Sequence, residues 1–515
     1  MYFVILLAII ITALYLYGTR TFNYWKSKGV KHDDPWPFVG NNFKQFTQRA
    51  SIGMMAAENY NKYPNEKVVG FYRSTSPELV VRDLDIAKRI LSTDFQHFYA
   101  RGLNPHKIVI EPLLRNIFFA DGDSWKLIRQ RFTPAFSTSK LKAMFNIITD
   151  RAEKLQVLAE DIAQLEFYDM RELMARYTTE FIGACGFGIN MESLNNENSQ
   201  FRQLGRRIFH RTPKDALNAA LKFIFPELCK NLHLLSPEVE KWTVQLVNSV
   251  MKDRNYKPAG KNDFLDLFLE LKQQGKIVGE SIEFKNPDGT PKTVELEFTD
   301  MLLIAQMFVL FGAGFETSST ASSYTLHQLA FNPECQEKVY EEIKEMLAKH
   351  GGKITYEAVN EMKYLEMAFY EGMRLYPSVA FLIRSCTSPK YTIPEINLTI
   401  DEDVKIYIPL QAMFRDPKYF PDPNKFDPER FRDGFSKSFF MPFGLGPRAA
   451  CYVLLGQMQS IAGIIAILQK YSVEPAPCSK LKLEPEPTSI VAEGVVGGVP
   501  LKLRKRSDWL ETFST

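Results

Sequence analysis

Residues 440–459 read Phe-Met-Pro-Phe-Gly-Leu-Gly-Pro-Arg-Ala-Ala-Cys-Tyr-Val-Leu-Leu-Gly-Gln-Met-Gln, and the rest of the chain is organised around this stretch. Two prolines and two glycines between 442 and 447 predict a tight irregular loop, because glycine permits positive φ and proline restricts φ. Arg448 ends the loop, Cys451 follows, and the apolar stretch to Leu468 predicts a buried helix. A helix N-terminus favours a thiolate, and a thiolate can bind the iron of a porphyrin. Cys451 is therefore a candidate thiolate ligand for a metal.

The composition is that of an ordinary globular protein with a large core. The chain has 515 residues, of which 45% are hydrophobic and 24% charged, and its formal net charge is +3. So small a net charge gives no reason to expect a nucleic-acid partner. Six cysteines and seven histidines are scattered without the spacing of a disulfide framework or a zinc site. We expect the bulk of the chain to occupy a reducing compartment.

The N-terminus predicts a membrane anchor over residues 1–19. Tyr2 to Tyr17 is apolar or aromatic except for Thr12, and such a stretch is close to the length that crosses a bilayer. It lacks the basic start and the small-residue cleavage site of a signal peptide, so we interpret it as retained. Four basic residues follow directly: Arg20, Lys26, Lys28 and Lys31. They predict a cytoplasmic location for the rest of the chain; the alternative is an imported, secreted protein.

The chain beyond the anchor divides into a hinge and a catalytic domain. Residues 20–41 are basic and proline-rich, which predicts an extended hinge, and residues 42–515 form the domain. Its hydrophobic pattern is mostly helical, with short alternating stretches between helices. The predicted elements are a hairpin at 66–85, helices over 123–273, a loop or surface hairpin at 275–297, a long helix from Thr299 to about Ala330, a helix at 357–375 and strands at 480–504. The predicted fold class is mainly α (α+β), a long central helix with small β-sheets.

The middle of the long helix carries the sequence Ala313-Gly314-Phe315-Glu316-Thr317. A carboxylate is costly to bury, and glycine destabilises a helix by about 1 kcal/mol relative to alanine. Two unfavourable residues side by side indicate a groove where a small ligand approaches the backbone. The alternative is a kinked core helix in which the Thr317 hydroxyl bonds back to a carbonyl.

Phe443 to Arg448 resembles the haem-binding signature of the cytochrome P-450 superfamily, Phe-x-x-Gly-x-Arg-x-Cys-x-Gly. Aligned without a gap, the signature places its cysteine at Ala450 and its last glycine at Tyr452. The cysteine of this chain comes one position later, at Cys451. Two arrangements are open: the loop absorbs one extra residue and Cys451 ligates the iron, or the helix frame is kept and Ala450 faces it. We assign the metal ligand to Cys451.

The resemblance also implies roles for other motifs. The helix Trp125-x-x-x-Arg129, with Arg384 and Arg448, is expected to hold the haem propionates, and Arg101 is a weaker candidate. Further haem contacts are expected from Phe443, Ala313 and Gly314, and a catalytic proton relay from Glu316 and Thr317. A structural ion-pair group is expected from Glu371, Arg374 and Arg430. Pocket walls are expected from Phe308, Phe311, Phe315, Phe381 and Leu382.

The chain looks most like insect microsomal members of the xenobiotic-metabolising type. That resemblance implies a haem (iron protoporphyrin IX) monooxygenase that inserts one atom of dioxygen into an apolar small molecule, a xenobiotic, a hormone or a lipid-like compound. Electrons would come from NADPH through a reductase, with cytochrome b5 as a second candidate donor, at the endoplasmic reticulum membrane. The alternative is a catalytically degenerate, membrane-anchored relative that acts as a ligand-binding or partner protein.

Overall fold

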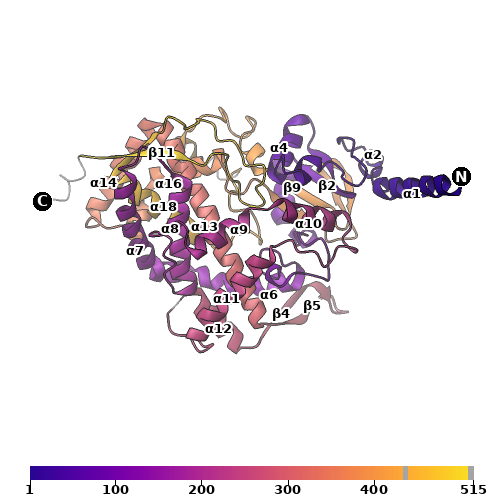
Figure 1. The fold of residues 1–515 in the computed structure, drawn as a ribbon, viewed down its shortest axis with the longest axis horizontal. Coiled ribbons are helices and arrows are strands. Elements are labelled where there is room, and N and C mark those ends of the chain that lie inside the picture. The colour runs from indigo at the N-terminus through magenta and orange to yellow at the C-terminus, as the bar shows by residue number, and fades with distance from the viewer. Residues whose placement is uncertain (262, 433–438, 508–515) are drawn as a thin grey trace.

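Helix α13, Asp300–Phe331, runs through the centre of the helical part of the molecule (Figure 1). The structure is a computed structural model that describes residues 1–261, 263–432 and 439–507. The Thr299 hydroxyl caps the helix by accepting a bond from the Leu302 N–H at 3.2 Å, and Pro333 begins the next helix. Most of α13 is buried. The predicted long central helix is confirmed.

The most extensive helix contacts of α13 are with α8 (Met170–Ile182), α16 (Lys363–Leu375) and α18 (Val453–Leu468). Close approach depends on small residues at the contacts. A Cβ atom at Gly372 of α16 would lie 2.5 Å from the Thr325 hydroxyl oxygen of α13. These contacts hold the central helix as a rigid element, which fixes whatever side chains it carries.

The remaining helices surround this group. Their bounds are α2 (Tyr24–Ser27), α3 (Phe43–Phe46), α4 (Ile52–Lys62), α5 (Leu84–Lys88), α6 (Gly122–Phe132), α7 (Thr138–Ile162), α9 (Gln200–Phe209), α10 (Pro213–Ile224), α11 (Pro237–Asp253), α12 (Phe264–Gln273), α14 (Pro333–Lys349), α15 (Tyr356–Glu361) and α17 (Leu410–Met413). The helical prediction for 123–273 is confirmed. The single helix predicted at 357–375 is wrong, because Met362 leaves helical geometry (ψ 82°) between α15 and α16. The Glu342 carboxylate then caps α16 by accepting two of its first N–H groups.

The main sheet lies on the side of the molecule nearest the N-terminal helix (Figure 1). It has the order β1-β2-β9-β6, from β1 (Val68–Arg73), β2 (Ser76–Val81), β9 (Lys405–Ile408) and β6 (Leu382–Ser385). The first two strands form the hairpin predicted at 66–85, which is confirmed. Strands β2 and β9 pair in parallel although they come from opposite ends of the chain.

Three smaller sheets complete the fold. The first pairs β4 (Lys276–Lys285) with β5 (Pro291–Glu297), the second pairs β7 (Lys390–Ile393) with β8 (Leu398–Asp401), and the third has the order β10 (Tyr471–Pro475), β11 (Pro500–Lys505), β3 (Tyr168–Asp169). The segment 275–297 is thus the surface hairpin. The strands predicted over 480–504 are confirmed only in part: β11 begins at Pro500, and 480–499 is irregular apart from isolated bridges such as Pro485 to Val495. Prolines and glycines interrupt the pairing there.

Helix α1, Tyr2–Thr19, projects from the body (Figure 1). In the described part of the chain, α1 and α13 are the two helices long and apolar enough to cross a membrane; α13 is mostly buried in the core, whereas α1 is exposed. The base of α1 contacts the body through three aromatic rings. Tyr17 lies 6.3 Å from Phe38 and 6.5 Å from Phe225, centroid to centroid. The apolar helix is therefore attached on the side where Phe225 follows α10.

Candidate active site

A cavity of about 400 Å³ lies against α13. Its walls come from α9, α10, α13, β6, the loop at 442–456 and the irregular segment 487–492. Most of these wall residues are apolar. Elements from both ends of the chain therefore meet around one space.

Three arginines form a cationic end of the cavity: Arg101, Arg384 and Arg448. The last two are only 2% and 3% exposed. Arg384 bonds the Ile383 carbonyl at 2.8 Å and leaves its Nε without a partner. Arg448 pairs with Asp121 at 2.9 Å and bonds the Tyr99 and Ala120 carbonyls, but its Nη1 has no partner.

Burial lowers the pKa of all three arginines. Repulsion from Arg101 lowers the pKa of Arg448 further and that of Arg384 to about 9. Among the described residues Asp121 is the one carboxylate paired with Arg448, so the group retains excess positive charge. Buried cations with orphan N–H groups are favourable only when an anion joins them. Two carboxylates on the edge of a flat ring, as in haem, would satisfy the excess charge of this group. The cationic end of the site fits haem.

The predicted helix pair Trp125 and Arg129 lies behind this end. The Trp125 ring lies under the Arg448 guanidinium, with its centroid 4.4 Å from Cζ, which holds Arg448 in place. Arg129 is close enough to Cys451 to lower the pKa of that thiol. Neither Trp125 nor Arg129 is among the described residues that line the cavity. Their direct contact with a propionate stays a prediction.

On α13, Ala313 and Thr317 line the cavity. The Thr317 hydroxyl donates to the Ala313 carbonyl at 2.7 Å, which is the back-bond foreseen in the alternative interpretation, yet the helix is continuous. Gly314 faces α8, because a Cβ there would lie 2.6 Å from Ile182 Cδ1. Its carbonyl accepts a bond from Gln459 Nε2 at 2.8 Å. The glycine therefore permits helix packing, and Thr317 is one of two residues, with Ser318, that bring a hydroxyl of α13 to the cavity.

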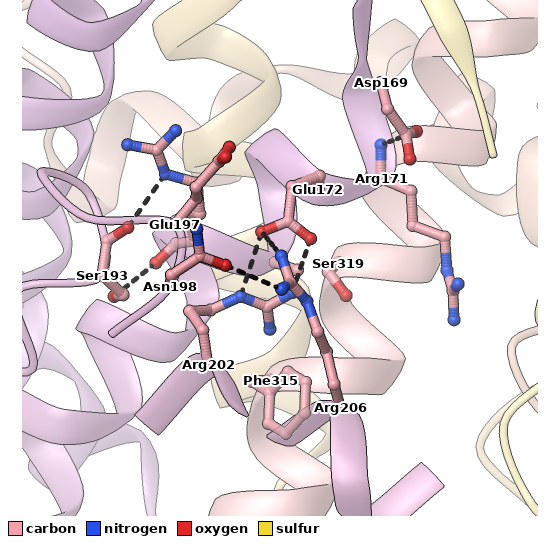
Figure 2. Close-up of polar contacts among 12 residues, drawn as sticks. Asp169, Arg171, Glu172, Ser193, Glu197, Asn198, Arg202, Arg206, Phe315 and Ser319 are labelled. Atoms are coloured by element: carbon pink, nitrogen blue, oxygen red, sulfur yellow. Dashed lines mark hydrogen bonds and ion pairs between the residues drawn. The ribbon is translucent and has the colours of Figure 1, made fainter. Parts of the chain in front are cut away.

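Glu316 lies on another face of α13. Its carboxylate accepts from the Arg171 guanidinium of α8, and it is not one of the described residues that line the cavity. Figure 2 shows the polar network beside it, in which Glu172 binds Arg202 at 2.8 Å and Arg206 at 3.1 Å. The same view places Phe315 beneath Arg202 (guanidinium to ring centroid 5.7 Å). The ion pair accounts for the buried carboxylate, and the predicted relay role of Glu316 stays a prediction.

The loop before α18 has the irregular geometry that its sequence predicts. Gly444 and Gly446 both have positive φ (83° and 74°). A Cβ at Gly446 would lie 2.0 Å from the Leu91 carbonyl oxygen, so only glycine fits there. The Ala450 N–H donates to the Phe443 carbonyl at 2.9 Å, which closes the loop, and Phe443 lines the cavity.

Ala450 and Tyr452 line the cavity, and Cys451 is not among its described lining residues. Cys451 packs partly buried against the main hydrophobic core. Burial raises the pKa of the Cys451 thiol, and this effect outweighs the stabilisation of the thiolate by nearby arginines and by the backbone N–H groups of Cys451 and Tyr452. Helix α18 begins only at Val453. The residue at the cavity is thus Ala450, the one that the gap-free alignment places at the cysteine position of the signature. Iron ligation by Cys451 is untested by this geometry and stays a prediction.

The predicted pocket walls are partly correct. Phe308, Phe381 and Leu382 line the cavity. Phe311 and Phe315 do not; Phe315 packs 5.7 Å from the Phe209 ring and fills the space left by Gly205. Sequence reasoning missed the basic side chains Arg207 and Arg211, which also line the cavity. Their only sequence signal is the cluster of basic residues between 202 and 214.

Comparison with known proteins agrees with this arrangement. The family model described as Cytochrome P450 matches residues 31–495. The chain is 36% identical to Cytochrome P450 6B2 of Helicoverpa armigera over 512 residues, covering 98% of this chain and 99% of that protein. It is 35% identical to Cytochrome P450 6a2 of Drosophila melanogaster over 521 residues, covering 98% and 100%. The residues matched by the family model include the central helix and the loop at 443–451, and the chain belongs to the cytochrome P450 family.

Proposed function

We propose that this protein is a haem-dependent monooxygenase that inserts one oxygen atom into an apolar small molecule. The observation that carries the proposal is one largely apolar cavity with the unsatisfied guanidinium group at one end and the Thr317 hydroxyl on its α13 wall. Haem, the cofactor of this family, supplies the activation of dioxygen when bound. The chain itself supplies the anion site, the hydroxyl and an apolar space that excludes water.

Within that proposal each polar group has a defined task. Arg101, Arg384 and Arg448 bind the two haem carboxylates, which offsets their mutual repulsion. The Thr317 hydroxyl holds a proton at Oγ1 on the cavity side of α13. In the structure that proton is donated to the Ala313 carbonyl, 2.7 Å away, and the same hydroxyl can turn to donate into the cavity.

Thr317→Ala is expected to uncouple oxygen reduction from product formation, because it removes the hydroxyl on the cavity side of α13. Product formed per NADPH should fall by about tenfold or more, while peroxide rises. The measurement is NADPH consumed, peroxide released and product formed with one oxidisable substrate. Thr325→Ala is the matched control, since its hydroxyl makes the same back-bond, to Ala321 at 2.8 Å, outside the cavity. Equal coupling in wild type and Thr317→Ala would remove Thr317 from the mechanism.

We further propose that α1 anchors the protein in the endoplasmic reticulum membrane, with the domain on the cytoplasmic side and an NADPH-dependent reductase as electron donor. The support is the exposed apolar helix and the four basic residues that come after it. Full-length protein should resist carbonate extraction from membranes, whereas protein without residues 1–20 should be released in part. Carbonate extraction of the full-length protein into the soluble fraction would contradict a spanning anchor.

A second candidate function is that of a ligand-binding relative without normal oxygen chemistry. The observation that favours it is the placement of Ala450 and Tyr452, rather than a sulfur atom, at the cavity. The spectrum of the reduced, carbon monoxide-bound protein separates the two candidates, because only a thiolate-bound iron gives the long-wavelength Soret band from which the family takes its name.

A further inference from the structure

Helix α9 and the residues just after it carry four arginines with different surroundings. Arg202 and Arg206 share the carboxylate of Glu172 (Figure 2). Arg207 pairs with Asp215 at 2.8 Å. Each of these three guanidiniums therefore pairs with a carboxylate of the protein, although two of them share one. The fourth arginine, Arg211, forms no such pair within the described residues.

Arg211 lines the cavity, and its Nε is buried without a hydrogen-bond partner. No ion pair or hydrogen bond joins its side chain to another residue in the described part of the chain. Its nearest acid, Asp215, is already engaged: it accepts from Arg207 and from the Thr212 N–H at 2.9 Å in the cap of α10. Burial lowers the pKa of Arg211, and the nearby cation Arg73 lowers it further, while the Asp215 carboxylate opposes part of this shift.

Arg73 does not offer Arg211 any compensation. It is itself a cation, and its Nε binds Glu78 at 2.9 Å in a fully buried pair. Arg211 therefore faces the cavity beside one acid, Asp215, whose carboxylate is already engaged by Arg207 and Thr212 and forms no ion pair with it. An arginine has five N–H donors and cannot shed its proton at physiological pH, so its orphan donors favour an anionic ligand.

The wall between Arg211 and Thr317 is apolar. Phe209 and Ile208 lie on the cavity and approach Gly312, five residues before Thr317 on α13. Phe381 and Tyr407 also line the cavity and pack against each other, with ring centroids 5.4 Å apart. A ligand that binds Arg211 with a charged head would place a hydrocarbon chain along these walls toward α13.

We propose that Arg211 binds the carboxylate of an amphipathic organic acid whose hydrocarbon chain extends toward Thr317. The planar fork of the guanidinium matches a carboxylate in a two-bond geometry, and the apolar walls suit an unbranched chain. The inference names the substrate class of the proposed monooxygenase and rests on that proposed function for the acid's being oxidised. Binding of the acid is a separate claim with its own test.

The test compares decanoate with decan-1-ol, which has the same chain length and no charge. Isothermal titration calorimetry on full-length holoprotein in lipid nanodiscs, with empty nanodiscs subtracted, gives the ratio of the two affinities. We expect wild type to prefer the acid by about tenfold or more, the effect of one charge-assisted pair. Arg211→Gln should lose the preference through weaker acid binding with the alcohol unchanged. Lys214→Gln, which removes an exposed charge three residues away, should keep it.

The ratio of affinities separates a lost contact from a damaged fold. General damage weakens both ligands and leaves the ratio unchanged, and an unchanged ratio in Arg211→Gln would overturn the proposal. Wild-type protein that binds the alcohol as tightly as the acid would also overturn the proposal, and this measurement requires no variant. An acid that binds through Arg211 but is not oxygenated would contradict the monooxygenase proposal and would still support the binding site.

Discussion

Cys451→Ala is expected to abolish the long-wavelength Soret band of the reduced, carbon monoxide-bound protein. Cys451 is the one thiol within the loop next to the cavity, and no other cysteine lies between residues 387 and 477. For Cys451 to reach the iron, the loop must take up one residue more than it does in the structure, at a strain of about 1–3 kcal/mol. Cys478→Ala, at an exposed cysteine outside the loop, is the control and should leave the band unchanged.

A second variant moves the sulfur rather than removing it. In Ala450→Cys with Cys451→Ile and Tyr452→Gly, the thiol takes the place of the residue that already lines the cavity. The glycine also removes the Tyr452 side chain from that wall. We expect this triple variant to show the band at full strength.

The two variants together decide between the proposed functions. Wild type that binds haem without showing the band, next to a triple variant that gains it, would refute Cys451 as the ligand. It would also favour the ligand-binding relative over the monooxygenase. A band in wild type that Cys451→Ala removes would establish that the loop rearranges when haem binds.

Glu371→Gln is expected to destabilise the fold by about 3–5 kcal/mol, because it leaves a buried arginine charge uncompensated. Glu371 and Arg374 are both 0% exposed and joined by two bonds, of 2.7 and 2.8 Å. Arg430 joins the same carboxylate at 3.3 Å, so the predicted ion-pair group is present. Arg374 also donates to the Phe414 and Pro423 carbonyls, which connects α16 to the segment that precedes the loop before α18.

The measurement is the midpoint of thermal unfolding together with the yield of folded protein. Glu429→Gln provides the control, because Glu429 and Arg432 have the same spacing of three residues on the surface. An exposed pair contributes at most about 1 kcal/mol, so its midpoint should hardly move. A similar loss in both variants would mean that burial adds nothing to the Glu371 group.

The sequence predicted the features that depend on local pattern. The apolar run after Thr299 is continuous and capped, so its helix could be located within a residue or two. The glycines at 444 and 446 occupy the positive-φ positions that their loop requires. The ion pair from Glu371 to Arg374 follows from helical spacing alone.

Other features depend on direction or on distant partners, which a sequence pattern does not contain. One residue along a helix rotates a side chain by about 100°, which separates Thr317 at the cavity from Glu316 at Arg171. A one-residue offset likewise decides that the side chain of Ala450, and not that of Cys451, lines the cavity. The place of Arg211 depends on how α9 and α10 pack over α13, for which no local signal exists.

The aromatic contact at the base of α1 determines which ligand concentration is relevant for binding, that in water or that in the lipid. Tyr17 packs on Phe225, which directly follows α10, and α10 supplies Ala219, Ala220 and Phe223 to the cavity wall. In a bilayer that holds α1, this wall is kept beside the lipid surface. An amphipathic acid or an apolar compound would then reach the cavity from the lipid phase, by diffusion in two dimensions. Half-saturation of the cavity would then depend on the mole fraction of the compound in the lipid. Adding protein-free vesicles at constant total compound would dilute it in the lipid, so the apparent affinity would fall although the protein itself is unchanged.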